Sequence, residues 1–312
     1  MSICQNYRDI FEKEIVQKSK GIIFSYSPIT DKYQYRSYSH GCSNTAVEEL
    51  GKLMRHNLFF YAFGEDEIVE YYEKNRFDSL ERAAKYAYQQ RLPKRANTAD
   101  GLPSEALLDL LIQIYNPTAY KLAVRTLFRQ NDNNEIKGYD LSYFSKEEES
   151  ITLWLGQAKL GSKSYCASSI NNDLLSKYTK EYLARQFFFI CDKRIEVTED
   201  AKEILEAIDK INVLMMDQDS RSRAERLIAY FVKNHFKIKI PCLLAYGEGT
   251  VYHDKSQVYE KIMNEVESIR SYYKKYVYSF DDIIPEIIFC VFPIESIERL
   301  RDKEKGFYAG LC

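Results

Sequence analysis

Three polar side chains interrupt two apolar stretches of the sequence. Asp140 lies near the start of residues 138–144, and Gln157 and Lys159 lie in the longer stretch 151–160. Both stretches have the composition of β-strands, in which side chains two positions apart point the same way. Gln157 and Lys159 therefore share a face. An acidic turn at 146–150 predicts a hairpin that brings Asp140 beside Gln157.

These residue types suit metal-dependent phosphodiester chemistry. The Asp140 carboxylate and the Gln157 amide oxygen, joined by the Glu105 carboxylate from a preceding helical segment, are hard oxygen donors of the kind that bind Mg²⁺ or Mn²⁺. Such a set leaves positions for water and for a phosphate oxygen. Lys159 beside the metal would be a fixed cation that orients a water or stabilises the charge of the transition state. The pattern predicts hydrolysis of a phosphodiester.

A purely structural interpretation of the same residues is also open. Asp140 could end a strand at a turn, Gln157 and Lys159 could form the solvated face of an edge strand, and Glu105 could complement a helix dipole. The apolar run 153–155 argues against an edge strand. A buried strand does not hold a lysine and a glutamine without a reason, which favours the functional interpretation.

The arrangement resembles the PD-(D/E)xK nuclease core, with Asp140 as its aspartate and residues 157–159 in the place of the (D/E)xK tripeptide. The departure is Gln157, whose neutral amide is a weaker metal ligand than a carboxylate. Within that superfamily, residues 138–140 followed by 153–159 are similar to the HamA family, the nuclease subunit of the Hachiman antiphage defence system. The resemblance implies a metal-dependent endodeoxyribonuclease in antiphage defence that acts on DNA together with a HamB-type helicase.

Two other functions remain open at this point. One is a stand-alone nuclease of the same fold in restriction or repair, without a helicase. The other is a non-catalytic adaptor that has kept the fold, because position 157 carries no carboxylate.

The element order around the polar residues predicts an α/β fold. Residues 98–312 are expected to form a mixed central sheet flanked by helices, which by resemblance is a PD-(D/E)xK restriction-endonuclease-like core. An alternating stretch at 237–246, a long helix at 256–276 and an apolar stretch at 286–293 predict a βαβ unit with parallel strands. The apolar segment 185–191 fits either a strand or a buried helix.

Residues 1–97 are expected to form an N-terminal hairpin and helical extension that packs on this core. The runs 21–27 and 32–38 predict a hairpin. Helices are predicted from Asn44, at 65–74, and at 79–90, where Ser79 is the expected N-cap. No linker or repeat separates this extension from the core.

Several basic side chains are candidates for nucleic-acid contact, and each also fits a solvated helix face, a helix C-terminus or a partner surface. Three precede the motif region, one begins the helix after the lysine strand, and two lie in the most basic stretch of the chain. They are Arg91, Lys94, Arg95, Lys163, Arg221 and Arg223. By analogy with the superfamily, Lys163, Tyr165 or Ser168 would meet the scissile phosphate.

Composition sets the remaining limits. The net charge of −2 over 312 residues gives no general attraction to nucleic acid, so binding would depend on local basic patches. The seven cysteines are scattered without CxxC pairs, which argues against a zinc site and for reduced thiols. No signal peptide or membrane span is recognisable, so we expect a cytoplasmic protein without membrane contact.

Overall fold

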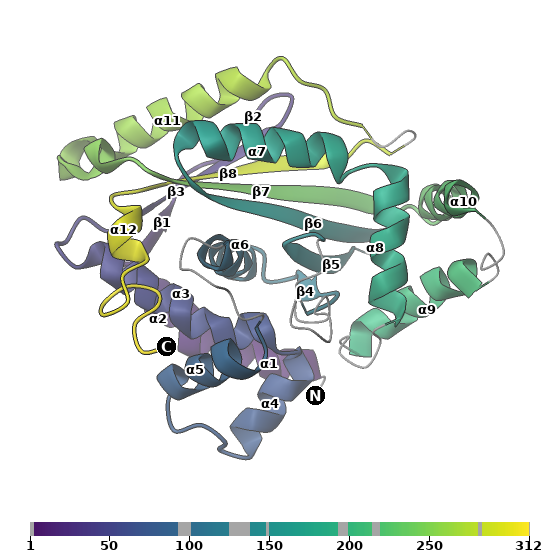
Figure 1. Cartoon of the computed structure of the whole chain (residues 1–312), viewed down its shortest axis with the longest axis horizontal. Helices are drawn as coiled ribbons and strands as arrows, with labels where there is room; N and C mark the ends of the chain where they lie inside the picture. Colours follow the sequence, from purple (N-terminus) through teal and green to yellow (C-terminus); the bar gives the residue numbers. More distant parts are fainter. Residues whose placement is uncertain are drawn as a thin grey trace.

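The structure, a computed structural model, describes residues 3–92, 101–124, 138–147, 150–192, 199–213, 219–279 and 283–311. Within these ranges the chain builds one mixed sheet with helices on both faces, which confirms the predicted α/β architecture (Figure 1). The strands are β1 (Ile23–Ser25), β2 (Ile29–Thr30), β3 (Gln34–His40), β4 (Tyr120–Lys121), β5 (Leu141–Glu147), β6 (Ser150–Gly161), β7 (Lys237–Gly247) and β8 (Glu286–Ile294).

The helices fall before, between and after the strands. Those of the N-terminal part are α1 (Ile3–Phe11), the π-helix η1 (Glu12–Val16), α2 (Gln17–Ser19), α3 (Ala46–Ala62), α4 (Glu65–Glu73), α5 (Leu80–Gln90) and α6 (Leu102–Tyr115). Those of the C-terminal part are α7 (Lys163–Ser176), α8 (Lys180–Asp192), α9 (Glu199–Val213), α10 (Ser220–Lys233), the 3₁₀ turns η4 (Gly249–Tyr252) and η5 (Lys255–Gln257), α11 (Val258–Tyr273) and α12 (Ile297–Leu300).

The sheet order is β1-β3-β8-β7-β6-β5-β4, with β2 paired to β3. Strands β4, β5 and β6 are antiparallel neighbours, whereas β6, β7, β8 and β3 run parallel. The predicted βαβ unit is confirmed as β7, α11 and β8, and the predicted N-terminal hairpin as β1 and β3. Because β3 also pairs with β8, this hairpin belongs to the central sheet. The division between residues 97 and 98 lies outside the described ranges and stays a prediction.

Both faces of the sheet are covered, as expected for strands that read as continuous apolar runs. Successive side chains of β7 show this: Leu243 belongs to the core cluster that contains α3 and α6, and Leu244 to the core cluster that contains α7 and α11. Figure 1 shows α7 and α11 over one face and α6 and α3 over the other. Segment 185–191, for which the sequence left two possibilities open, lies in α8, where Phe187 and Ile190 are buried at helical spacing.

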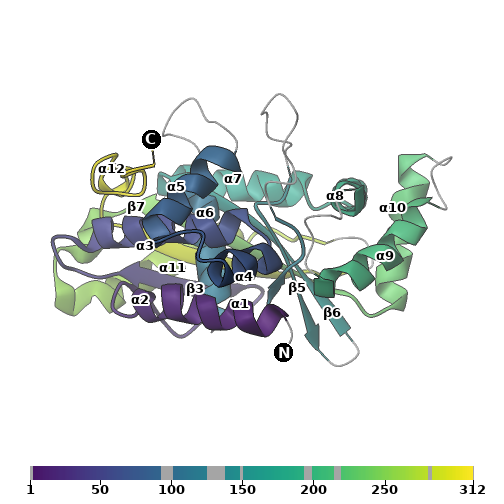
Figure 2. The same ribbon diagram turned by 90° about the horizontal axis from the view of Figure 1, so that it is seen from below.

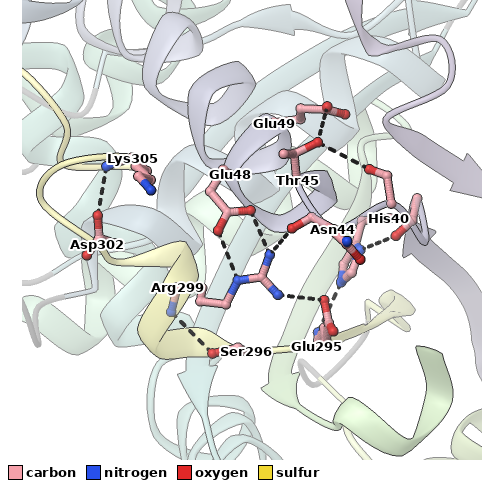
Figure 3. Close-up of polar contacts among 12 residues, drawn as sticks. His40, Asn44, Thr45, Glu48, Glu49, Glu295, Ser296, Arg299, Asp302 and Lys305 are labelled. Carbon is pink, nitrogen blue, oxygen red and sulfur yellow. Dashed lines mark hydrogen bonds and ion pairs between the residues drawn. The ribbon is translucent and has the colours of Figure 1, made fainter. Parts of the chain in front are cut away.

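The C-terminal segment closes over α3 (Figure 3). The Arg299 guanidinium donates from Nε to Glu48 Oε1 at 2.9 Å and from Nη2 to Glu48 Oε2 at 2.8 Å, a bidentate pair, and from Nη1 to Glu295 Oε2 at 3.1 Å. A Cβ at Gly51 would lie 2.8 Å from the Phe307 backbone nitrogen. A glycine on α3 therefore permits the close approach of the last residues of the chain.

No helix in the described ranges has both the length and the apolar character needed to span a bilayer.

Candidate active site

The register of β5 and β6 brings Asp140 beside Gln157, as the sequence predicts. Leu141 pairs with Gly156, and the Asp140 backbone nitrogen donates to the Gly156 carbonyl at 2.9 Å. The Ala158 backbone nitrogen in turn donates to Asp140 Oδ2 at 2.8 Å. This second bond fixes the orientation of the carboxylate at the start of β5.

Glycine at position 156 lets a helix press against the strand that carries the site. A Cβ there would lie 2.9 Å from Leu108 Cδ2 and 3.0 Å from Leu141 Cβ. Helix α6 therefore packs directly over the β5–β6 hairpin, on the face that Leu141 shares. That contact supports the backbone of β5 and β6 on the face of the sheet opposite Gln157 and Lys159.

Gln157 and Lys159 point to the opposite face, where α7 covers the sheet. They pair with Cys242 and Leu244 of β7, which belong to the core beneath α7 and α11. Gln157 is fully buried, and 18% of the Lys159 side chain is exposed. Since unpaired polar groups are costly in such a place, these two side chains require polar partners.

Helix α7 supplies the partners through Asp173 and Lys177, one helical turn apart. Lys159 Nζ lies 2.6 Å from Asp173 Oδ2, Lys177 Nζ lies 3.1 Å from Asp173 Oδ1, and Lys177 Nζ donates to Gln157 Oε1 at 2.7 Å. We call these four residues the polar chain. The resemblance led us to expect a contact from this helix, but at Lys163, Tyr165 or Ser168. The sequence signal for Asp173 and Lys177 is an i,i+4 acid and base, which solvated helix faces also show.

Lys159 is held as a cation by its neighbours. Burial lowers the pKa of its ammonium, but the carboxylates of Asp140 and Asp173 more than offset this and raise it above the usual lysine range. Lys159 is therefore protonated at neutral pH. Such a group can stabilise negative charge or orient a water molecule, but it cannot accept a proton from that water.

Glu105 approaches from the other side of the sheet. It lies in the first turn of α6, is 6% exposed, and accepts a hydrogen bond from the Tyr61 hydroxyl at 2.7 Å. Tyr61 and Asp140 both line a narrow pocket at the start of β5. Glu105 is thus connected to the neighbourhood of Asp140 through Tyr61.

The same pocket is lined by Asp109 and Lys121, which the sequence did not single out. Asp109 accepts hydrogen bonds from Asn57 Nδ2 at 2.8 Å and from the Tyr143 hydroxyl at 2.6 Å. Lys121 is buried and donates to the Phe63 carbonyl at 3.0 Å, and burial lowers the pKa of its ammonium. These contacts tie α3 and α6 to β4 and β5, so they support the strand on which Asp140 begins.

The family model of HamA matches residues 9–311 of the sequence. The chain belongs to the HamA family. The match contains all the site residues described above, and it gives this HamA-family chain a role in Hachiman antiphage defence. A comparison with curated proteins finds no match.

The donor set of this HamA-family chain fits a hard cation that keeps much of its water. Asp140 and Gln157 offer a carboxylate and an amide oxygen on one face, and Mg²⁺ is commonly held by one or two carboxylates plus water and phosphate oxygens. The Gln157 oxygen already accepts a bond from Lys177, so it would have to exchange that partner to bind a metal. Within the described ranges, no three His, Cys, Asp or Glu side chains gather as a metal site.

The four basic candidates within the described residues of the HamA-family chain lie at the end of α5, at the start of α7 and on α10. Arg91 forms an ion pair with Glu67, Lys163 lies 2.6 Å from Glu265 Oε2, and Arg221 Nε lies 3.3 Å from Glu225 Oε1. Arg223 lines a groove between α8 and α10. Lys94 and Arg95 lie outside the described residues.

Proposed function

We propose that this HamA-family chain is a metal-dependent endodeoxyribonuclease that acts in antiphage defence with a HamB-type helicase. The observation that carries the proposal is the placement of Asp140, Gln157 and Lys159 on one face, with Lys159 kept charged by two carboxylates. A lysine and a glutamine in a covered strand are costly for stability alone. The polar chain therefore supports a chemical role.

In this proposal Asp140 and Gln157 hold Mg²⁺ or Mn²⁺, and Glu105, on the other side of the sheet, acts on this site through Tyr61. The bound metal would supply Lewis acidity toward a phosphate oxygen and a water of lowered pKa. Asp140 is oriented for this by the Ala158 N–H. Lys159, aligned by Asp173, stabilises the charge that develops on the phosphate.

Lys177 fixes the orientation of the glutamine in the tripeptide. An amide at position 157 carries no negative charge, yet its oxygen binds the ammonium of Lys177, which Asp173 also holds. The pair Gln157–Lys177 thus keeps the amide oxygen facing the site. Binding of a metal to that oxygen would shift Lys177 fully onto Asp173.

The test compares wild type with Lys159→Ala on linear and circular plasmid DNA, in Mg²⁺, Mn²⁺ or EDTA. We expect cleavage that needs metal and Lys159, including loss of the circular form. Lys239→Ala is the matched control, since Lys239 lies on the neighbouring strand β7, has a similar exposure of 21%, and pairs with Glu286 at 3.5 Å. Circular dichroism checks the fold of each variant.

Three results would contradict the proposal, in whole or in part. Cleavage by Lys159→Ala at the wild-type rate would remove Lys159 from the reaction. Absence of cleavage both for the chain alone and with a co-expressed HamB-type helicase would leave the adaptor alternative. Full cleavage by a chain that forms no stable complex with such a helicase would favour the stand-alone nuclease.

A further inference from the structure

A groove runs between the end of α7, helix α8 and helix α10. Figures 1 and 2 both show α8, α9 and α10 gathered at one side of the molecule, next to β5 and β6. The groove is lined by Ser176, Thr179, Glu181, Tyr182, Ala184, Arg185, Phe188 and Arg223. We call it the α8–α10 groove. Its volume of about 470 Å³ lies in the range of roughly 300 to 1,000 Å³ in which proteins bind small ligands, so it has room for a nucleotide.

Positive charge and an exposed aromatic ring meet in this groove. Among the described residues, no carboxylate forms an ion pair with Arg185 or Arg223, and Glu181 is the one acidic side chain of the lining. Arg185 lies over the Tyr182 ring, 4.9 Å from its centroid. Phe188 lines the groove and is 40% exposed, so its ring is accessible to a ligand there.

The α8–α10 groove adjoins the candidate active site. The Tyr182 ring, which lines the groove, contacts the Tyr139 ring edge to face at 5.5 Å, and Tyr139 directly precedes Asp140. The Tyr139 hydroxyl donates to the Lys177 carbonyl at 3.0 Å, and Lys177 follows the groove residue Ser176. Tyr139 alone therefore separates the groove residue Tyr182 from Asp140, and the groove residue Ser176 directly precedes Lys177 of the polar chain.

We propose that the α8–α10 groove binds single-stranded DNA that continues from the strand at Asp140 and Lys159. Phosphates lie against Arg185 and Arg223, and a base stacks on Phe188. An arginine pair beside an exposed aromatic ring is the combination that single-strand binders use, whereas a duplex backbone would leave the ring unused. The inference rests on the proposed nuclease function, for which it specifies the form of the substrate.

The test measures binding of a fluorescein-labelled oligothymidine by anisotropy, in EDTA, over a series of salt concentrations. For Arg185→Gln/Arg223→Gln, we expect the negative slope of log affinity against log salt to become shallower by about 1.4, because each single-strand phosphate contact contributes about 0.7. Phe188→Ala should weaken binding about fivefold or more. Glu181→Gln should tighten it, because one repulsive charge is removed.

Two control variants match these changes. Arg82→Gln removes an arginine of α5 that pairs with Asp78 at 2.9 Å, and it should leave the slope unchanged. Val232→Ala truncates another exposed apolar residue, 47% exposed on α10 but not part of the groove lining. It should leave the affinity unchanged.

Several outcomes would overturn the inference. One is absence of single-strand binding by the wild type, and another is a wild-type salt slope in the double arginine variant. A third is that the groove substitutions weaken binding only to duplex DNA or only to a co-purified helicase. Because the assay contains EDTA, it is independent of cleavage. Normal cleavage with an unchanged salt slope would reject the groove alone, and groove-dependent binding without any cleavage would reject the nuclease alone.

Discussion

Asp173 should be among the most stabilising charged residues of this chain, and Asp173→Asn tests that directly. Its carboxylate lies 2.6 Å from Lys159 Nζ and 3.1 Å from Lys177 Nζ, and its side chain is 15% exposed. At an effective dielectric constant of about 20, unit charges about 4 Å apart attract by about 4 kcal/mol. Asparagine keeps an oxygen acceptor but no charge, so two ammonium groups lose their shared partner.

The net loss is smaller than the sum of the two attractions. Lysine side chains regain water when released, and Asp140 still attracts Lys159. Measured losses on breaking a buried pair are about 3–5 kcal/mol. Because all three side chains keep some exposure, we expect the free energy of unfolding to fall by about 3 kcal/mol.

Urea unfolding, followed by the fluorescence of Trp154, measures this loss. Trp154 is the sole tryptophan, is 4% exposed, and lies on β6 near Gln157. Removal of the unpaired charge in Asp173→Asn/Lys159→Met should restore part of the loss. Glu70→Gln, which breaks the exposed Glu70–Lys74 pair, is the control and should leave the midpoint unchanged. A loss below about 1 kcal/mol for Asp173→Asn, with an unchanged m-value, would refute the reasoning.

Three further predictions concern the metal, pH and packing. Gln157→Glu should bind Mn²⁺ at least about tenfold more tightly in a titration, because a carboxylate replaces an amide; equal affinity would exclude residue 157 as a ligand. Burial lowers the pKa of His40 to about 4, so the stability that neutral His40 contributes is complete above pH 6.5 and is lost as pH falls toward 4. Urea unfolding should show a loss of about 2 kcal/mol between pH 7.5 and pH 5, reduced in His40→Gln and retained in His253→Gln. Gly51→Ala should lower the unfolding free energy by about 1–3 kcal/mol, since its Cβ would meet backbone 2.8 Å away, and a neutral effect would show that the C-terminal segment can move aside.

The sequence predicted the parts of the fold that depend on neighbouring residues. The β5–β6 hairpin follows from two apolar stretches and an acidic turn, and the βαβ unit follows from the order of its elements. Asp140 and Gln157 came together for the same reason, because a hairpin register is local. Segment 185–191 could not be assigned, since consecutive phenylalanines fit a buried helix as well as a strand.

The partners of the site residues could not be predicted in this way. Asp173 and Lys177 have the composition of any solvated helix face, and only packing of α7 on β6 turns them toward Gln157 and Lys159. Arg223 is far from Asp140 in sequence, and α8 brings its helix to the groove beside the site. Such contacts depend on three-dimensional packing rather than on local pattern.

The pairing of β3 with β8 constrains how this protein is made. Gln34 lies beside Ile288 in the finished sheet, so the edge of β3 away from β1 and β2 gains its neighbour only after nearly the whole chain has been synthesised. Contacts between such distant residues form slowly, and an unpaired strand edge invites association with other chains. We therefore expect the nascent chain to need protection at β3 while it remains on the ribosome. A chain cut short before β8 would have no complete sheet, so we expect only chains that include β8 to reach the folded state.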